Sequence, residues 1–261
     1  MTIVGLAPFE DGFTPPGPGD FELPAVFAGV TKPMLQLVLA ALLVVIFFWV
    51  VSRRGAMVPG KLQFAGEQAY TFVRNGIARD IIGSRDFMTF VPYLVALFFF
   101  ILVNNLFGLV PLIQFPSFSR ASFAYGLAAL TWLLYNAVGI WRHGPLGYLK
   151  HQSVPGGVSG PILALIVPLE LISNILVRPF TLALRLFANM FAGHLLLILF
   201  TLGGEYLLLH SDVAFYKPIG VIALLLAIAI SFLELLVQFL QAYVFTLLTA
   251  MYVSGALAEE H

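Results

Sequence analysis

Arg185 lies near the middle of a stretch, residues 159 to 200, that is otherwise almost entirely apolar. An arginine side chain stays protonated at every physiological pH. Placing it near the centre of a bilayer costs about 2.5 to 3.5 kcal/mol on insertion scales. Because something must offset that cost, an arginine at this depth indicates a functional site, and the chemistry it offers is that of a fixed positive charge.

More polar side chains follow at helical spacing around Arg185. On a wheel of about 100° per residue, five of them lie within about 60° of it. They are Glu170, Asn174, Arg178, Thr181 and Asn189. His194 lies at about 180°, so we expect it on another side of the helix. A simpler interpretation of Arg178 is that it neutralises Glu170 or extends toward the membrane interface.

A second polar stripe, of opposite charge, occurs in residues 217 to 256. Ser231, Gln238 and Gln241 lie within about 60° of Glu234. Carboxyl and imidazole groups exchange protons, so Glu234 and His194 predict a proton relay beside the fixed charge. The alternatives are that the amide and hydroxyl side chains only hold membrane helices together, and that Arg185 and Glu234 form a structural ion pair.

The composition predicts an all-α integral membrane protein. Hydrophobic residues make up 60% of the 261 residues and charged residues 10%, against about 25% charged in an ordinary soluble domain. The mean hydropathy is +0.97. The net charge of zero gives no sign of a nucleic-acid partner, and the absence of cysteine excludes disulfides and thiol chemistry.

Five apolar runs each reach the roughly 20 residues that span a bilayer. They are residues 34 to 51, 87 to 112, 121 to 141, 159 to 200 and 217 to 256. Residues 1 to 33 predict a polar tail, and residues 34 to 261 a single membrane domain. The last two runs are too long for upright spans, since about 40 helical residues extend roughly 60 Å. We therefore expect two long, steeply inclined helices that form a hairpin, joined by a loop at residues 203 to 216.

Residues 61 to 85 predict an amphipathic helix at the membrane interface. Apolar side chains recur there at helical spacing, with Lys61, Glu67, Arg74 and Arg79 largely between them. The alternative is a re-entrant or soluble loop helix. With the N-terminus outside, the inner segments hold eight basic residues and the outer ones three, so the positive-inside rule predicts a periplasmic N-terminus and a cytoplasmic C-terminus.

Three motifs resemble subunit a of the rotary F-type ATP synthase. They are Arg185-Leu-Phe-Ala-Asn189-Met190, Leu240-Gln241-Ala242-Tyr243 followed by Leu248-Thr249 and Tyr252, and Asn104-Asn-Leu-Phe-Gly108-Leu-Val-Pro111. The resemblance covers nearly the whole chain from the first span onward. It implies a stator subunit of a bacterial inner membrane, packed against a c-ring of carboxylate-bearing subunits and held by the subunit b stalk.

The resemblance also implies roles for single residues. Arg185 matches the indispensable arginine, which favours the ionised form of each passing ring carboxyl and bars direct proton flow between two offset half-channels. Asn189 and Gln241 match polar positions beside it, and Glu170 matches one in the cytoplasmic half-channel. His194 and Glu234 occupy two positions at which many bacterial members carry the acid first and the histidine second. The swapped order in this chain resembles the mitochondrial and alphaproteobacterial type. The coupling ion is taken to be the proton.

Two other functions and a set of expected absences complete the predictions. A secondary transporter with an anion site at Arg185 would show discontinuous helices and repeats, which the sequence lacks. An intramembrane hydrolase would need a nucleophile with its base or a metal triad, and His194 with Glu234 supplies only two metal ligands. The Gly-rich segment Val154-Pro-Gly-Gly lacks the Gly-Lys-Ser/Thr of a phosphate-binding loop. We therefore expect no cofactor, no metal, no bound nucleotide and no catalysis by this chain itself.

Overall fold

The computed structural model describes residues 13–21, 25–27, 29–53, 60–110, 113, 115–153, 162–211, 213 and 215–258. Several segments named above lie outside these residues: the start of the predicted tail, the Gly-rich segment at Val154 and the acidic residues Glu259 and Glu260. The described chain is an all-α integral membrane protein, with one small two-stranded hairpin in the tail.

Five helical segments of the described chain are long and apolar enough to cross a bilayer. They are α1 (Lys32–Arg53), α4 (Phe87–Leu106), α5 (Ala121–Ser153), the run α6 (Leu163–Ile172), η4 (Ser173–Val177) and α7 (Arg178–Leu209), and α8 (Tyr216–Leu257). Large apolar side chains such as Phe232 and Leu236 are exposed on them. Lipid or a partner subunit covers such side chains in a membrane complex. The predicted inclination of the last two helices stays a prediction.

The chain forms two compact units. The first comprises residues 1–42, 102–120 and 187–241, and the second comprises residues 43–101, 121–186 and 242–261. The predicted single membrane domain stays a prediction.

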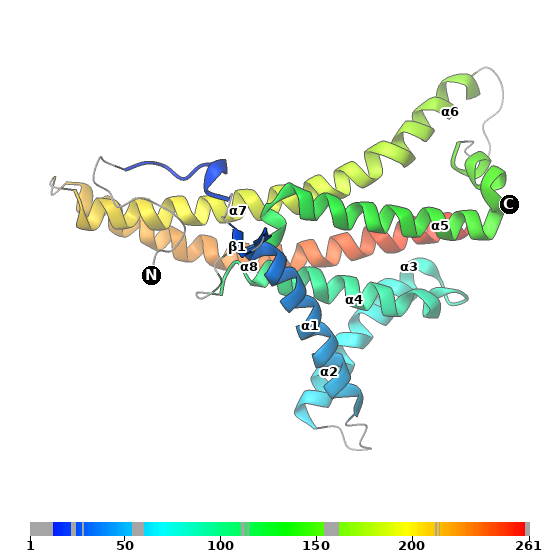
Figure 1. Cartoon of the computed structure of the whole chain (residues 1–261), viewed down its shortest axis with the longest axis horizontal. Coiled ribbons are helices and arrows are strands. Elements are labelled where there is room, and N and C mark those ends of the chain that lie inside the picture. The colour runs from blue at the N-terminus through cyan, green and yellow to red at the C-terminus, as the bar shows by residue number, and fades with distance from the viewer. Residues whose placement is uncertain are drawn as a thin grey trace. The chain divides into compact units, whose positions relative to one another are not determined.

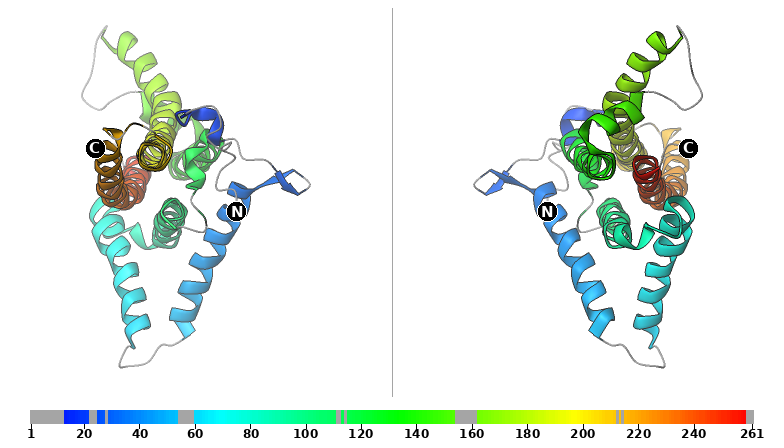
Figure 2. Two further views of the ribbon diagram at one scale, coloured as in Figure 1. Left: turned by 90° about the vertical axis from the view of Figure 1, so that its left-hand side faces the viewer. Right: turned by 90° about the vertical axis from the view of Figure 1, so that its right-hand side faces the viewer.

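The first unit is built around residues 187–209 of α7 and residues 216–241 of α8, which run antiparallel (Figure 1; Figure 2). The sequence predicted a loop beginning at residue 203, but α7 continues to Leu209 and the connection is residues 210–215. Gly204, which the sequence placed in this loop, lies in the helix and allows close packing instead. A Cβ on Gly204 would lie 3.0 Å from the side chain of Leu224, and one on Gly220 would lie 2.9 Å from the carbonyl oxygen of Gly204. Glycine there lets the two backbones approach.

The tail contributes short elements to this unit. A 3₁₀ turn, η1 (Pro18–Phe21), precedes strands β1 (Ala25–Phe27) and β2 (Val30–Thr31), which pair antiparallel with Gly29 at a positive φ of 83° between them. A second 3₁₀ turn, η3 (Ser117–Ser119), has a buried hydroxyl, that of Ser117, which donates to the carbonyl oxygen of Pro33. The predicted polar tail is therefore partly structured.

In the second unit, α5 extends beyond its predicted end at residue 141. Gly144 adopts a positive φ of 72° and Pro145 follows it, which produces a kink after which helical turns resume as far as Ser153. The kink folds the end of the helix back, and the Tyr148 ring packs where a Cβ on Gly139 would lie. The sequence predicted that this span ends at residue 141. In the structure it is followed by a folded-back segment, residues 145–153.

The long helical run also departs from ideal geometry. Between Pro168 and Pro179 the backbone forms the π turn η4 (Ser173–Val177). Pro179 has no N–H to donate to the preceding turn, and a π turn accommodates such a break. Its extra residue rotates the residues before it relative to those after it. Asn174, within this turn, is buried, while Thr181, on the same predicted stripe, is exposed.

The predicted helix at residues 61 to 85 is helical from Lys61 to Ile82. It comprises α2 (Lys61–Val73), the π turn η2 (Arg74–Arg79) and α3 (Asp80–Ile82). Its buried side includes Gly66, which faces the side chain of Val51 on α1, and Val73 and Ile77. The Phe72 ring lies 5.6 Å from that of Phe98 on α4. Its position at the membrane interface stays a prediction, as does the orientation of the chain.

Candidate functional site

The central feature of the first unit is a buried acid–imidazole pair between α7 and α8. The Nδ1 atom of His194 lies 3.9 Å from Oε1 of Glu234, and the two residues are 3% and 4% exposed. Gly193 makes room for the carboxyl group, since a Cβ there would lie 3.6 Å from the Cγ atom of Glu234. The structure thus brings together two titratable groups that are far apart in sequence, within ion-pair distance and shielded from solvent in the isolated chain.

Gln238 connects the carboxyl group to the next turn of α8. Its Nε2 atom donates a hydrogen bond of 3.3 Å to Oε1 of Glu234, and the side chain is fully buried. Asn105, at the end of α4, donates to the backbone oxygen of Gln238 over 3.4 Å. Oε2 of Glu234 is buried without a hydrogen-bond partner among the described residues. A buried polar atom of this kind is where a water molecule or a transferred proton is expected.

Asn189 and Gln241 form the next polar contact between the two helices. The amide nitrogen of Asn189 donates a hydrogen bond of 2.7 Å to Oε1 of Gln241. The sequence placed these two residues on separate stripes, and the structure joins them. On α8, the side chains of Glu234 and Gln241 thus contact polar groups of α7, and the Gln238 side chain bonds to Glu234 between them.

Arg185 belongs to the second unit and is exposed on the surface of the chain. Within the described part of the chain, no hydrogen bond or ion pair reaches its guanidinium group. His194 is buried, as expected for a residue on the opposite side of the helix. Within the first unit, Glu234 is paired with His194 and Gln238.

Two residues of the predicted stripes bond only to their own helix. The hydroxyl of Thr181 donates to the carbonyl oxygens of Val177 and Arg178, at 2.8 and 3.1 Å. The hydroxyl of Ser231 donates to the carbonyl oxygen of Ala227 at 2.8 Å. Such bonds satisfy a hydroxyl within a membrane helix without a second partner. The structure therefore supports a local structural role for both.

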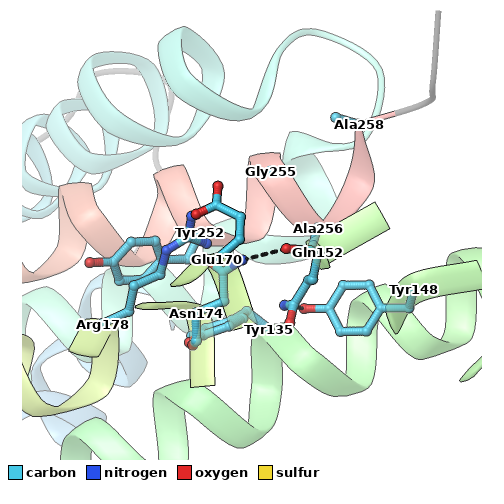
Figure 3. Close-up of a pocket in the computed structure, with 10 residues that line it drawn as sticks. All are labelled: Tyr135, Tyr148, Gln152, Glu170, Asn174, Arg178, Tyr252, Gly255, Ala256 and Ala258. Atoms are coloured by element: carbon cyan, nitrogen blue, oxygen red, sulfur yellow. Dashed lines mark hydrogen bonds between the residues drawn. The ribbon is translucent and has the colours of Figure 1, made fainter. Parts of the chain in front are cut away.

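A polar cavity of about 260 Å³ lies in the second unit and collects the other predicted residues (Figure 3). Glu170, Asn174 and Arg178 line it from the helical run that leads into α7. The Arg178 guanidinium lies over the Tyr252 ring of α8, 5.4 Å from its centroid. No ion pair joins Arg178 to Glu170 among the described residues, so the simple neutralisation considered from the sequence has no direct contact to support it.

Three more residues that line the cavity, Tyr135, Tyr148 and Gln152, come from α5, and Gly255, Ala256 and Ala258 come from the end of α8 and just beyond it. Gln152 accepts a hydrogen bond of 2.9 Å from Asn174 at its backbone oxygen (Figure 3), and the Tyr135 hydroxyl donates to the backbone oxygen of Asn174 over 3.3 Å. Gln152 also bonds to the Tyr148 hydroxyl. Sequence reasoning missed Tyr148 and Gln152 because it ended this helix at residue 141. Tyr135 gave only the weak signal of one hydroxyl in an apolar run.

Metal chemistry finds no support among the described residues, where no group of three or more His, Asp or Glu side chains converges. The chain is a multi-pass helical membrane protein that buries an acid–imidazole pair between α7 and α8 and carries an exposed arginine on α7. That is the class of protein that the fold and the site define.

The model of the ATP synthase A chain family matches residues 34–254, and the chain belongs to this family. It is 63% identical to the ATP synthase subunit a of Nocardioides sp. over 265 residues, which cover 96% of this chain and 95% of the relative. It is 50% identical to that of Pseudarthrobacter chlorophenolicus over 268 residues, the full length of both. The subunit of Streptomyces lividans is 41% identical over 230 residues, 88% of this chain and 80% of the relative.

Proposed function

We propose that this chain is the stator subunit of the proton channel of an F-type ATP synthase, and that it couples proton flow to rotation of a c-ring. Family membership supports this proposal. The observation that carries it is the buried His194–Glu234 pair on the helices that also bear Asn189, Gln241 and Arg185. In a multi-pass membrane chain, the acid and the imidazole can take up and release protons, and the arginine is a fixed positive charge that blocks their direct passage.

Arg185 provides the barrier in this mechanism. A permanent cation attracts the ionised carboxylate of a passing ring subunit and favours loss of its proton. It also repels protons that would otherwise pass straight from one side to the other. Its exposed position on the isolated chain is the position that a group meeting another subunit needs. Rotation of the ring then becomes the route by which each proton crosses.

Two separate polar regions provide the routes in and out. His194 and Glu234, with Gln238, Asn189 and Gln241, are assigned to the outer half-channel. The cavity lined by Glu170, Asn174 and Arg178 is assigned to the cytoplasmic one, since a cavity of about 260 Å³ has room for several water molecules. Each proton that crosses 100 mV releases about 2.3 kcal/mol, so several are collected for each ATP made elsewhere in the complex.

The setting follows from the same proposal. The chain works in the inner membrane of a bacterium, with a periplasmic N-terminus, a subunit b stalk holding it still, and no catalysis of its own. The alternative function is a secondary transporter. In a transporter Arg185 would bind a substrate anion, whereas in a stator subunit it would face the carboxyl groups of the c-ring.

The test is ATP-driven proton pumping in inverted membrane vesicles. Arg185→Ala removes the fixed charge, and we expect pumping to fall below detection while the complex still assembles. Thr181→Ala is the matched control on the same helix, because the Thr181 hydroxyl bonds only to carbonyl oxygens of the preceding turn, and we expect most pumping to remain. Coupled pumping by Arg185→Ala would defeat the assignment.

A further inference from the structure

The described start of the tail, residues 13–21, lies along α7 and is called here the N-terminal strap (Figure 1; Figure 2). At one end the Phe13 ring lies 5.6 Å from that of Tyr206, and its Cζ atom lies 3.6 Å from where a Cβ on Gly203 would be. At the other end the Phe21 ring lies 4.8 Å from that of Phe191. Both anchors are aromatic, and both rest on α7 within the first unit.

The inner anchor of the strap reaches the acid–imidazole pair. Phe21 is 4% exposed, and its ring meets the His194 ring edge-on at 6.1 Å between centroids. Phe115, also buried, meets the same imidazole edge-on at 6.4 Å, and the Phe21 and Phe115 rings lie 5.8 Å apart. Two phenylalanine rings therefore cover one side of His194, and one of them comes from a part of the chain outside residues 34–254.

We propose that Phe21 is a positioning residue for proton exchange: it closes the His194–Glu234 pair to water on the strap side and holds the imidazole ring in its orientation. An apolar ring offers water no hydrogen bond, so water and hydrated ions are excluded from that side. The proton then reaches Glu234 along the polar side chains of α8. The role of Phe21 in proton exchange rests on the proposed function, whereas its role in shielding the His194–Glu234 pair from water does not.

Accessibility of a thiol at position 194 tests the covering directly, because the chain has no native cysteine. His194→Cys is made alone and together with Phe21→Ala. The intact complex, reconstituted in liposomes, is treated with a small charged thiol reagent from both sides, and labelling of the position-194 peptide is followed by mass spectrometry. We expect labelling about tenfold faster with Phe21→Ala, because the rate at which a thiol reacts depends on its exposure.

Two controls distinguish the loss of the Phe21 ring over position 194 from a general loosening of the structure. Phe21→Leu keeps an apolar side chain over the site, and with His194→Cys it should restore slow labelling. Val213→Cys, in the exposed connection between α7 and α8, should label at one rate whether residue 21 is Phe or Ala. Equal labelling of His194→Cys with Phe21 and with Phe21→Ala would overturn the inference. A failure of the proposed function would instead appear as coupled pumping by Arg185→Ala, with the labelling result unchanged.

Discussion

Arg185 and Glu234 carry charges of opposite sign, yet only the carboxyl group can gain and lose its proton under working conditions. The structure gives them surroundings that match this difference. Glu234 is enclosed by His194, Gln238 and Gly193, whereas Arg185 is exposed on the chain and thus open to a partner. A fixed charge acts at a distance on whatever passes it, while an exchanging group needs a neighbour that can pass on the proton.

Glu234→Gln keeps the shape of the side chain and one oxygen that can accept the hydrogen bond from Gln238, but it removes the carboxyl group that gains and loses a proton. We expect slower ATP synthesis and an altered pH dependence of its rate, measured in energised vesicles across a range of outer pH. Ser231→Ala is the control on the same side of α8, because the Ser231 hydroxyl bonds only to Ala227. A pH profile unchanged by Glu234→Gln would remove Glu234 from the route.

His194→Ala should impair pumping less than Arg185→Ala does. Removing the imidazole leaves a space beside Glu234, and water molecules in that space can carry protons to the carboxyl group. No water molecule replaces a permanent positive charge. Initial rates of ATP-driven pumping in vesicles with equal amounts of complex give the ranking, and an equal or larger loss in His194→Ala would reverse the roles assigned to the two residues.

At the scale of elements, the apolar runs of the sequence were enough to predict five helical segments long and apolar enough to cross a membrane, while the placement of Arg185 and His194 on opposite sides of one helix stays a prediction. The apolar runs were not enough to place helix ends. Gly203-Gly204 has the composition of a turn, and only the partner helix, with Leu224 against Gly204, explains why α7 continues through it. Contacts between distant segments cannot be read from local patterns, because turns and close helix packing favour the same small residue.

The candidate site shows the same limit. Glu234, Gln238 and Gln241 were predicted as one stripe because they share a helix, but the pairing of Glu234 with His194 and of Gln241 with Asn189 depends on the register between α7 and α8. That register is set partly by the Gly204–Gly220 contact. The cavity side chains of α5 were missed for another reason, since Gly144 and Pro145 look like the end of a helix and are in fact a kink.

Gly220→Ala tests this packing. The added methyl group would lie 2.9 Å from the carbonyl oxygen of Gly204 and 2.8 Å from the Leu208 side chain, so α7 and α8 must separate. Overpacking of this kind costs about 1 to 3 kcal/mol. We expect a lower midpoint for thermal inactivation of the purified complex, together with reduced pumping because the His194–Glu234 contact depends on the register of the helices.

Gly126→Ala is the matched change, since a Cβ on this glycine of α5 meets nothing within 4 Å. An alanine in an open helical position is neutral or slightly stabilising. If Gly220→Ala were as stable and as active as Gly126→Ala, close approach at Gly220 would not be what sets the register.

At the scale of the whole molecule, many large apolar side chains lie on the surface while the polar groups of the candidate site on α8 are buried. On α8, Glu234, Gln238 and Gln241 are buried, while Phe232 and Leu236 are 70% and 64% exposed. Such a surface is suited to lipid or to apolar helices of other subunits. A stator subunit needs both, since one side of it must meet a rotor and the rest must meet the bilayer.

The identity of the subunit that contacts this surface distinguishes the two proposed functions, a stator subunit and a secondary transporter. An affinity-tagged chain, solubilised in mild detergent, should copurify with a small hairpin subunit in several copies, each with one membrane carboxyl group, and mass spectrometry identifies it. Arg185→Ala should retain that subunit, because the apolar surface, rather than one charge, supplies most of the contact area. A chain that purifies alone under conditions that keep the rest of the complex intact would favour the transporter, in which Arg185 faces a soluble anion rather than a moving carboxylate.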